Sequence, residues 1–124
     1  MSTGKLAPGD AAEIEVEVTK DLSINRMGRP GADVLSTSSL LKLMELCSIE
    51  ATDPFLEDGY ATVGYAVDGL RHLAPTAIGA VVKVKAVITE VNGTRISYKI
   101  EALEGDQKIG VSTHKRAVIS KDGS

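Results

Sequence analysis

Aromatic residues and cysteine are scarce in this chain of 124 residues. It contains one Phe, three Tyr and no Trp, so aliphatic side chains must build most of the core. Its single cysteine, Cys47, excludes an internal disulfide and fits a reducing, cytoplasmic compartment. Two histidines beside that one thiol give no metal-ligand spacing, and we expect no metal and no resident cofactor.

The chain also lacks a surplus of positive charge and a long apolar run. A formal net charge of -3 argues against nucleic acid as a partner. No segment reaches the roughly 20 apolar residues of a membrane span, and no signal peptide is visible. Glycine-rich phosphate loops and the Gly-x-Ser-x-Gly nucleophile motif are absent as well. We therefore expect one globular domain over residues 1–124 that contacts no membrane, with residues 1–10 as a loose lead-in.

One helix is predicted over residues 38–51. Ser36, Thr37 and Ser38 are candidate N-caps, and Pro54 ends the helix. Apolar side chains cover most of its circumference, which predicts burial on most sides.

Long strands with alternating polarity make up most of the remaining chain. Gly64 and Gly69 inside one of them indicate a bulge or a close backbone approach. Asn92-Gly93 predicts a type I′ hairpin turn. The expected strands cover residues 11–20, 60–71, 80–91, 94–103 and 107–119, with a loop over residues 21–33.

This order of elements predicts an α+β protein with the hotdog fold. One long central helix would be wrapped by a curved antiparallel sheet of five or six strands, which buries the pattern economically. Cystatin-like folds also place a half-barrel around a helix, but they usually begin with the helix. The long hairpins late in the chain favour the hotdog arrangement.

Three side chains stand out as candidates for chemistry. Glu45 lies between Leu41 and Ile49 on the helix, where desolvation would make a carboxylate a stronger base; the alternative is a solvated Glu45 near Lys42. Thr37 either caps the helix or faces an oxyanion held at the helix start. It precedes Glu45 by a little over two turns, so both can point the same way.

The two histidines and the cysteine are weaker candidates. His72 ends a predicted strand and His114 lies within one, and a lone histidine is more often structural or exposed than catalytic. Cys47, inside an apolar helix, is expected to be an inert core residue.

Several short motifs, taken in order and with their spacing, resemble a thioesterase family that includes fluoroacetyl-CoA thioesterase. The resemblance extends from about residue 10 to residue 119. Its motifs are Ser36-Thr37 through Leu43-Met44-Glu45-Leu46-Cys47, Thr62-Val63-Gly64, His72-Leu73-Ala74-Pro75-Thr76, and Gly110-x-x-Thr113-His114-x-Arg116-Ala117-Val118.

This resemblance implies a hotdog homodimer that cleaves acyl-CoA thioesters along its subunit interface. The family's catalytic residues fall on Thr37, Glu45 and His72, and a glycine near the acyl group falls on Gly64. Compared with that family, this chain has one extra residue between Gly64 and His72, near Asp68-Gly69, which a bulge could accommodate. Residues 24–34 contain none of the aromatic residues that form the lid of the fluoroacetyl enzyme, so we do not predict fluoroacetyl-CoA as the substrate.

The resulting prediction is hydrolysis of an acyl-CoA to free acid and coenzyme A, which enters as part of the substrate. Arg71, Lys115 and Arg116 are candidates for the CoA phosphates, or are ordinary solvated strand charges. The alternative function is a non-hydrolytic acyl-CoA binding or sensing module, whereas the helix signature of hotdog dehydratases is absent. The acyl group, the choice between a dimer and a dimer of dimers, and the role of Glu45 as base or nucleophile are left open.

Overall fold

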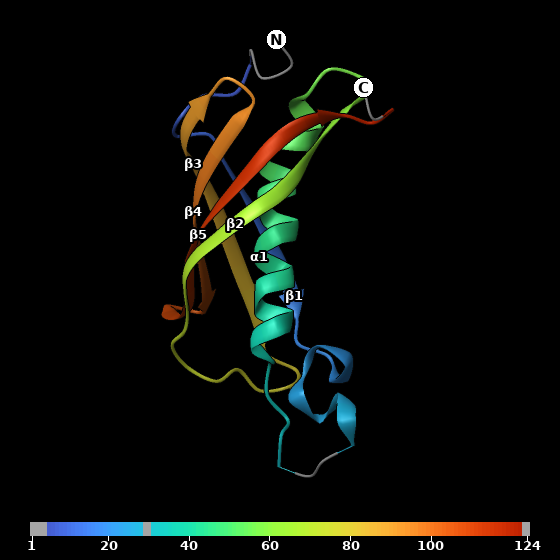
Figure 1. Cartoon of the computed structure of the whole chain (residues 1–124). Helices are drawn as coiled ribbons and strands as arrows, with labels where there is room; N and C mark the ends of the chain where they lie inside the picture. The colour runs from blue at the N-terminus through green and yellow to red at the C-terminus, as the bar shows by residue number, and fades with distance from the viewer. Residues whose placement is uncertain (1–4, 29–30, 123–124) are drawn as a thin grey trace.

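The fold consists of one long helix lying against a curved antiparallel sheet (Figure 1). The computed structural model describes residues 5–28 and 31–122. Within them the sheet has five strands in the order β1-β3-β4-β5-β2. The elements are β1 (Ala11–Glu17), α1 (Thr37–Thr52), β2 (Tyr60–His72), β3 (Val81–Asn92), β4 (Arg95–Glu104) and β5 (Gln107–Ser120), with short 3-10 turns at Lys20–Leu22, Ile24–Met27 and Asp53–Phe55. The predicted hotdog architecture is confirmed.

Alternating side chains give the sheet one buried face against α1. Along β3, Val82, Val84, Ala86 and Ile88 are buried while the lysines between them are exposed, as the alternation predicts. Ile96, Tyr98, Ile100 and Ala102 on β4 continue this face. The core is therefore aliphatic, with Tyr98 as the one aromatic side chain among the buried residues that the structure describes.

Helix α1 begins and ends close to the predicted positions. Ser36 is the N-cap, and its hydroxyl accepts a hydrogen bond of 3.1 Å from the backbone N–H of Ser39. The helix ends at Thr52, just before the turn that contains Pro54. The prediction that the helix is buried on most sides is wrong for the single chain, because Leu46 keeps 42% of its surface exposed. The helix packs one face on the sheet, and its outer face presents Leu46 between the exposed Lys42 and Glu50.

Gly110 on β5 allows α1 to approach the sheet closely. A Cβ atom at this position would lie 2.8 Å from Leu40 Cδ2 and 3.2 Å from Met44 Cε, both on buried side chains of α1. Gly110 also pairs with His72 at the end of β2. The contact therefore places the end of β2 beside the first turns of the helix.

Strand β2 is irregular where the sequence predicts it. Its pairing with β5 shifts register between Gly64 and Ala66, and again between Asp68 and Arg71. Gly69 lies in the second irregularity with a φ of 61°, a conformation that favours glycine. The bulge expected near Asp68-Gly69 is confirmed, and it places one more residue on β2 than on the facing segment of β5.

Two local predictions are wrong. Asn92 pairs with Arg95, so the turn consists of Gly93 and Thr94, and only Gly93 has a positive φ, as in a type II′ turn. A register shift between Ile88 and Glu90 moves the hairpin by one residue and accounts for this difference. The lead-in is also not loose throughout, because Leu6 is buried in the core. Residues 1–4 of the lead-in and residues 29–30 of the predicted loop lie outside the described residues.

We predict that Gly110→Ala lowers the free energy of unfolding by about 1–3 kcal/mol, because the added methyl group forces Leu40 or Met44 out of its packed position. Chemical denaturation measures the change. The matched control is Lys99→Ala on the exposed face of β4, which should change stability by less than about 0.5 kcal/mol. Equal stabilities of the wild type and Gly110→Ala would show that the contact is not tight.

Candidate active site

Thr37 and His72 form the first half of the candidate site. Thr37 is the first residue of α1, and its Oγ1 lies 2.8 Å from Nδ1 of His72, at hydrogen-bonding distance. Ser36 caps the helix, so the Thr37 hydroxyl is not used as the cap. The capping interpretation of Thr37 is therefore wrong, and its hydroxyl is available for a contact with a residue 35 positions away.

The imidazole of His72 is half-buried beside an apolar cavity. Its Nε2 atom is buried and has no hydrogen-bond partner among the residues described. Burial lowers the pKa of His72, which favours the neutral ring at neutral pH. A cavity of about 320 Å³ adjoins the pair, lined by Thr37, His72 and the apolar residues Ile24, Val34, Leu35, Leu73, Ala74 and Pro75.

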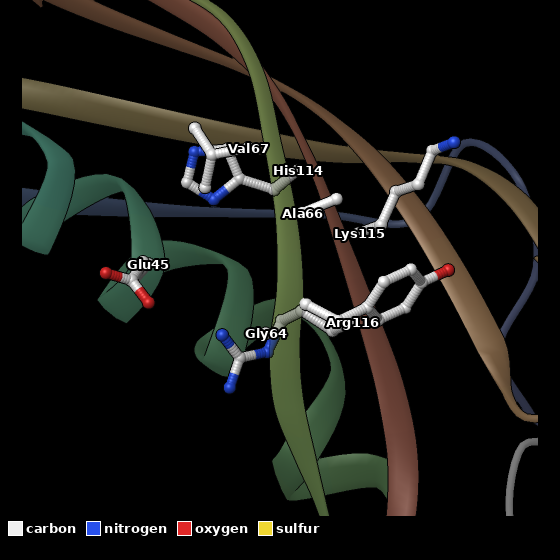
Figure 2. A pocket seen from close by; sticks show the side chains of 8 residues that line it. Glu45, Gly64, Ala66, Val67, His114, Lys115 and Arg116 are labelled. Atoms are coloured by element: carbon white, nitrogen blue, oxygen red, sulfur yellow. The ribbon is translucent and has the colours of Figure 1, made fainter.

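Glu45 and Gly64 form the second half, in a different cavity. This cavity measures about 230 Å³ and lies between the middle of α1 and the β2–β5 pair (Figure 2). Glu45 is half-buried, and its Oε2 would lie 3.7 Å from a Cβ atom placed on Gly64. The missing side chain of Gly64 leaves the space in front of this carboxylate open.

Arg116 completes the second half and differs from its predicted role. It is 5% exposed, and its Nη1 would lie 3.2 Å from a Cβ on Gly64. Nε donates to Thr62 Oγ1 over 2.7 Å, and Nη2 donates to the Thr62 carbonyl over 3.0 Å. The Thr62 hydroxyl in turn donates to Asp53 Oδ1 over 2.6 Å. Arg116 is thus neither a solvated strand charge nor a cation at the mouth of the site, because its guanidinium is held inside beside Gly64.

The other two basic candidates are exposed. Lys115 lies between His114 and Arg116 on β5, and its side chain is directed to the side of the sheet away from Glu45 (Figure 2). Arg71 directly precedes His72. Both positions keep these side chains available to an anionic ligand, and their assignment to CoA phosphates stays a prediction.

The two halves do not meet within one chain. Thr37 and Glu45 are eight residues apart, which corresponds to about 12 Å along a helix. They line separate cavities, and within residues 5–28 and 31–122 no hydrogen bond joins Glu45 to Thr37 or His72. Within the single chain, Thr37 and His72 therefore form one group and Glu45 lies apart from them.

His114 is a residue of this site that the sequence did not identify, since it was considered a weaker candidate than Thr37 and Glu45. It is 2% exposed and lines the same cavity as Glu45. Burial, reinforced by the nearby Arg116 guanidinium, lowers the pKa of His114 to about 4. The available signal was the alternation Ser112, His114, Arg116, Val118, which places four side chains on the buried face of β5.

The described residues contain neither a metal-binding cluster nor a membrane-spanning helix. Over the described part of the chain, no group of three or more His, Cys, Asp or Glu side chains is arranged to hold a metal ion. No helix there has the length and apolar character needed to span a membrane. Cys47 is buried, and burial raises the pKa of its thiol to about 11, as an inert core cysteine requires.

Comparison with known structures supports the assignment of the hotdog fold. A hot-dog-like protein from Thermanaerovibrio acidaminovorans superposes with a TM-score of 0.87 at 21% identity, covering 98% of this chain and 90% of that one. A thioesterase superfamily member from Thermus thermophilus gives a TM-score of 0.86 at 30% identity, covering 96% and 88%. The chain is a hotdog-fold protein.

The match to one thioesterase family is more specific. The fluoroacetyl-CoA-specific thioesterase family, FlK, matches residues 18–122, and this chain belongs to that family. The fluoroacetyl-CoA thioesterase of Streptantibioticus cattleyicolor is 38% identical over 87 residues, which are 70% of this chain but only 62% of that protein. A substituted FlK in complex with fluoroacetate and CoA superposes with a TM-score of 0.84 at 29% identity, covering 94% of this chain and 98% of that one.

The low pKa of His114 predicts a pH-dependent loss of stability. Between the ordinary value of about 6.5 and the folded value of about 4, the unfolded chain binds a proton at His114 that the folded chain does not. The free energy of unfolding should therefore fall as the pH falls through this window, by at most about 1.4 kcal/mol per pH unit.

Denaturation curves of the wild type and His114→Phe between pH 7 and pH 5 measure this effect. The variant should lose the His114 contribution, so the difference in stability between the two proteins should change with pH. Its remaining slope includes His72, whose pKa is lowered in the same direction. Parallel stability profiles would contradict the assignment of a neutral, buried His114.

Proposed function

We propose that this protein hydrolyses an acyl-CoA thioester to a free carboxylic acid and CoA. The observation that carries the proposal is the hydrogen bond between Thr37 and His72 at the helix start. Ser36 is the N-cap, so the Thr37 hydroxyl is not needed for capping. Membership of the FlK family supports the same reaction class. The bound fluoroacetate and CoA of the related enzyme are the two product types that such a reaction leaves.

In the proposed reaction the carboxylate of Glu45 drives attack on the acyl carbon. As a base, it accepts a proton from water while the water oxygen bonds to the acyl carbon and the C–S bond breaks. As a nucleophile, it forms an anhydride with release of the thiolate, and water then cleaves the anhydride. In both routes one water is consumed and the CoA thiolate receives a proton.

The remaining groups orient the thioester and stabilise its charge. Backbone N–H groups near Gly64 and at the start of α1 are suited to hold the developing oxyanion. A neutral His72, oriented through Thr37, can donate a hydrogen bond to the leaving sulfur or to water. Lys115 and Arg71, both exposed, would attract the phosphates of CoA.

We propose further that a homodimer completes the site. Strand β2 is at the edge of the sheet, where a row of backbone hydrogen-bonding groups has no partner strand. Tyr60, Val63, Tyr65 and Val67 on this strand and Leu46 on α1 are exposed apolar side chains. Pairing of two β2 edges would cover them and bring Thr37 and His72 of the partner subunit towards Glu45. A dimer of dimers and a cytoplasmic location stay predictions.

The acyl group is expected to be different from fluoroacetate. Ile24 and Val34 contribute aliphatic side chains to the cavity beside Thr37 and His72, and the segment between them has no aromatic residue. A site without an aromatic cover suits an ordinary aliphatic acyl group. The competing function, acyl-CoA binding without turnover, would show tight binding with no release of free thiol.

We predict that Glu45→Gln lowers kcat for acyl-CoA hydrolysis by about 10²–10⁴-fold, because the amide can neither accept the proton nor attack the carbonyl. Thiol release from a panel of saturated acyl-CoAs measures the rate. Glu50→Gln is the matched control, since Glu50 is an exposed glutamate on the same helix. Thr37→Val should also lose activity, whereas Thr37→Ser keeps the hydroxyl and most of it.

Full activity of both Glu45→Gln and Thr37→Val would refute the assignment of these residues. Binding of acyl-CoA by the wild type without any thiol release from the panel would favour the binding module instead.

We predict that Leu46→Glu converts the dimer to a monomer, because it puts a charge in place of the exposed apolar side chain of α1 that we assign to the interface. Sedimentation velocity measures the mass, and thiol release should fall together with dimerisation. Val81→Glu is the control, since Val81 is an exposed residue on β3, away from the β2 edge. A wild-type monomer with full activity would contradict the composite site.

A further inference from the structure

His114 is a buried polar residue that the proposed reaction has not yet used. It projects from β5 into the cavity that also contains Glu45, with Gly64 and Arg116 in the same wall (Figure 2). Only 2% of its surface is exposed. It is therefore enclosed by the site and is not a surface histidine that happens to lie nearby.

The imidazole of His114 has no hydrogen-bond partner among residues 5–28 and 31–122. Its Nε2 atom is buried and unpaired there. An unsatisfied imidazole in a core costs stability relative to an apolar side chain of similar size. A function that needs a nitrogen in this cavity accounts for the choice of histidine.

The groups around His114 restrict what it can do. Arg116 presents a fixed positive charge, and together with burial it keeps the imidazole neutral at physiological pH. A neutral ring accepts a hydrogen bond at one nitrogen and donates at the other. Glu45 is an acceptor, Arg116 is only a donor, and the exposed Lys115 side chain is directed to the other side of the sheet (Figure 2). Besides Glu45, the cavity lining has two side chains that can accept a hydrogen bond, those of Tyr65 and His114, and of these two His114 is buried whereas Tyr65 is exposed.

We propose that His114 is a further catalytic residue, which orients the attacking water by accepting one of its hydrogens while Glu45 faces the other. Held by two acceptors in the direct route, the water oxygen directs a lone pair at the acyl carbon. Its proton goes to Glu45 as the C–S bond breaks, and the imidazole of His114 stays neutral. The proposal rests on the thioesterase function argued above and adds the residue that selects water as the nucleophile.

Competition between water and hydroxylamine tests this role. Hydroxylamine is a stronger nucleophile and does not depend on a site that orients water, and it converts the acyl group to a hydroxamate. In His114→Phe, which keeps the ring volume but lacks both nitrogens, acid formation should fall at least about tenfold. The ratio of hydroxamate to acid should rise at least about fivefold, with little change in KM for the acyl-CoA.

Two further variants separate catalysis from structure. His114→Asn retains a polar amide near the position of Nδ1 and should return the product ratio towards the wild-type value, which also keeps the test valid if His114→Phe folds poorly. Ser112→Ala alters a buried residue on the same face of β5, outside the two cavities, and should leave the ratio unchanged.

An unchanged product ratio in both His114 variants, with thiol release intact, would overturn the proposal and leave the thioesterase function standing. Absence of thiol release from the wild type would overturn both. An equal rise of the ratio in Ser112→Ala would show that general loosening of β5 causes the effect, and this would also overturn the proposal.

Discussion

The close approach of α1 to β5 at Gly110 determines where the functional groups lie. Leu40 occupies the space that a side chain at this position would need, so the first turns of the helix rest directly on the sheet. His72 is the register partner of Gly110 and is therefore carried to the helix start, where Thr37 reaches its ring. The bulge at Gly69 adjusts β2 so that this pairing is possible. The Thr37–His72 contact is thus a consequence of the close packing of α1 against β5.

A second constraint, the burial of Arg116, organises the other half of the site. A buried guanidinium is tolerated only when its donors are satisfied. Thr62 accepts two of them, and Asp53 accepts from the Thr62 hydroxyl and from its backbone N–H. This chain of hydrogen bonds connects the end of α1 to β2 and β5. It fixes a positive charge beside Gly64, in front of Glu45, and gives the cavity its polarity.

Local patterns in the sequence were sufficient for the elements of the fold. Alternation along β3 and β4, a cap among Ser36, Thr37 and Ser38, and the end of the helix near Pro54 each depend on a few neighbouring residues, and each was predictable. The turn at Gly93 was not, because a bulge on β3 changed the register. The alternation along β5 indicates that Arg116 lies on the buried face, but its hydrogen-bond partners were not predictable, since the sheet brings Thr62 and Asp53 to it from far along the chain. The separation of Thr37 from Glu45 along the helix follows from the helix rise, and in our proposal a second subunit brings the two kinds of group together.

A complementation experiment tests the claim of a composite thioesterase site most directly. Thr37→Val and Glu45→Gln are each inactive by this account, and the two proteins would be unfolded together, refolded and assayed for thiol release. In a mixed dimer the intact Glu45 of one subunit meets the intact Thr37 of its partner, which restores one site of two. Since half of the refolded dimers are mixed, we predict recovery of about a quarter of the wild-type activity. No recovery from a refolded mixture that forms dimers would contradict a site shared between subunits.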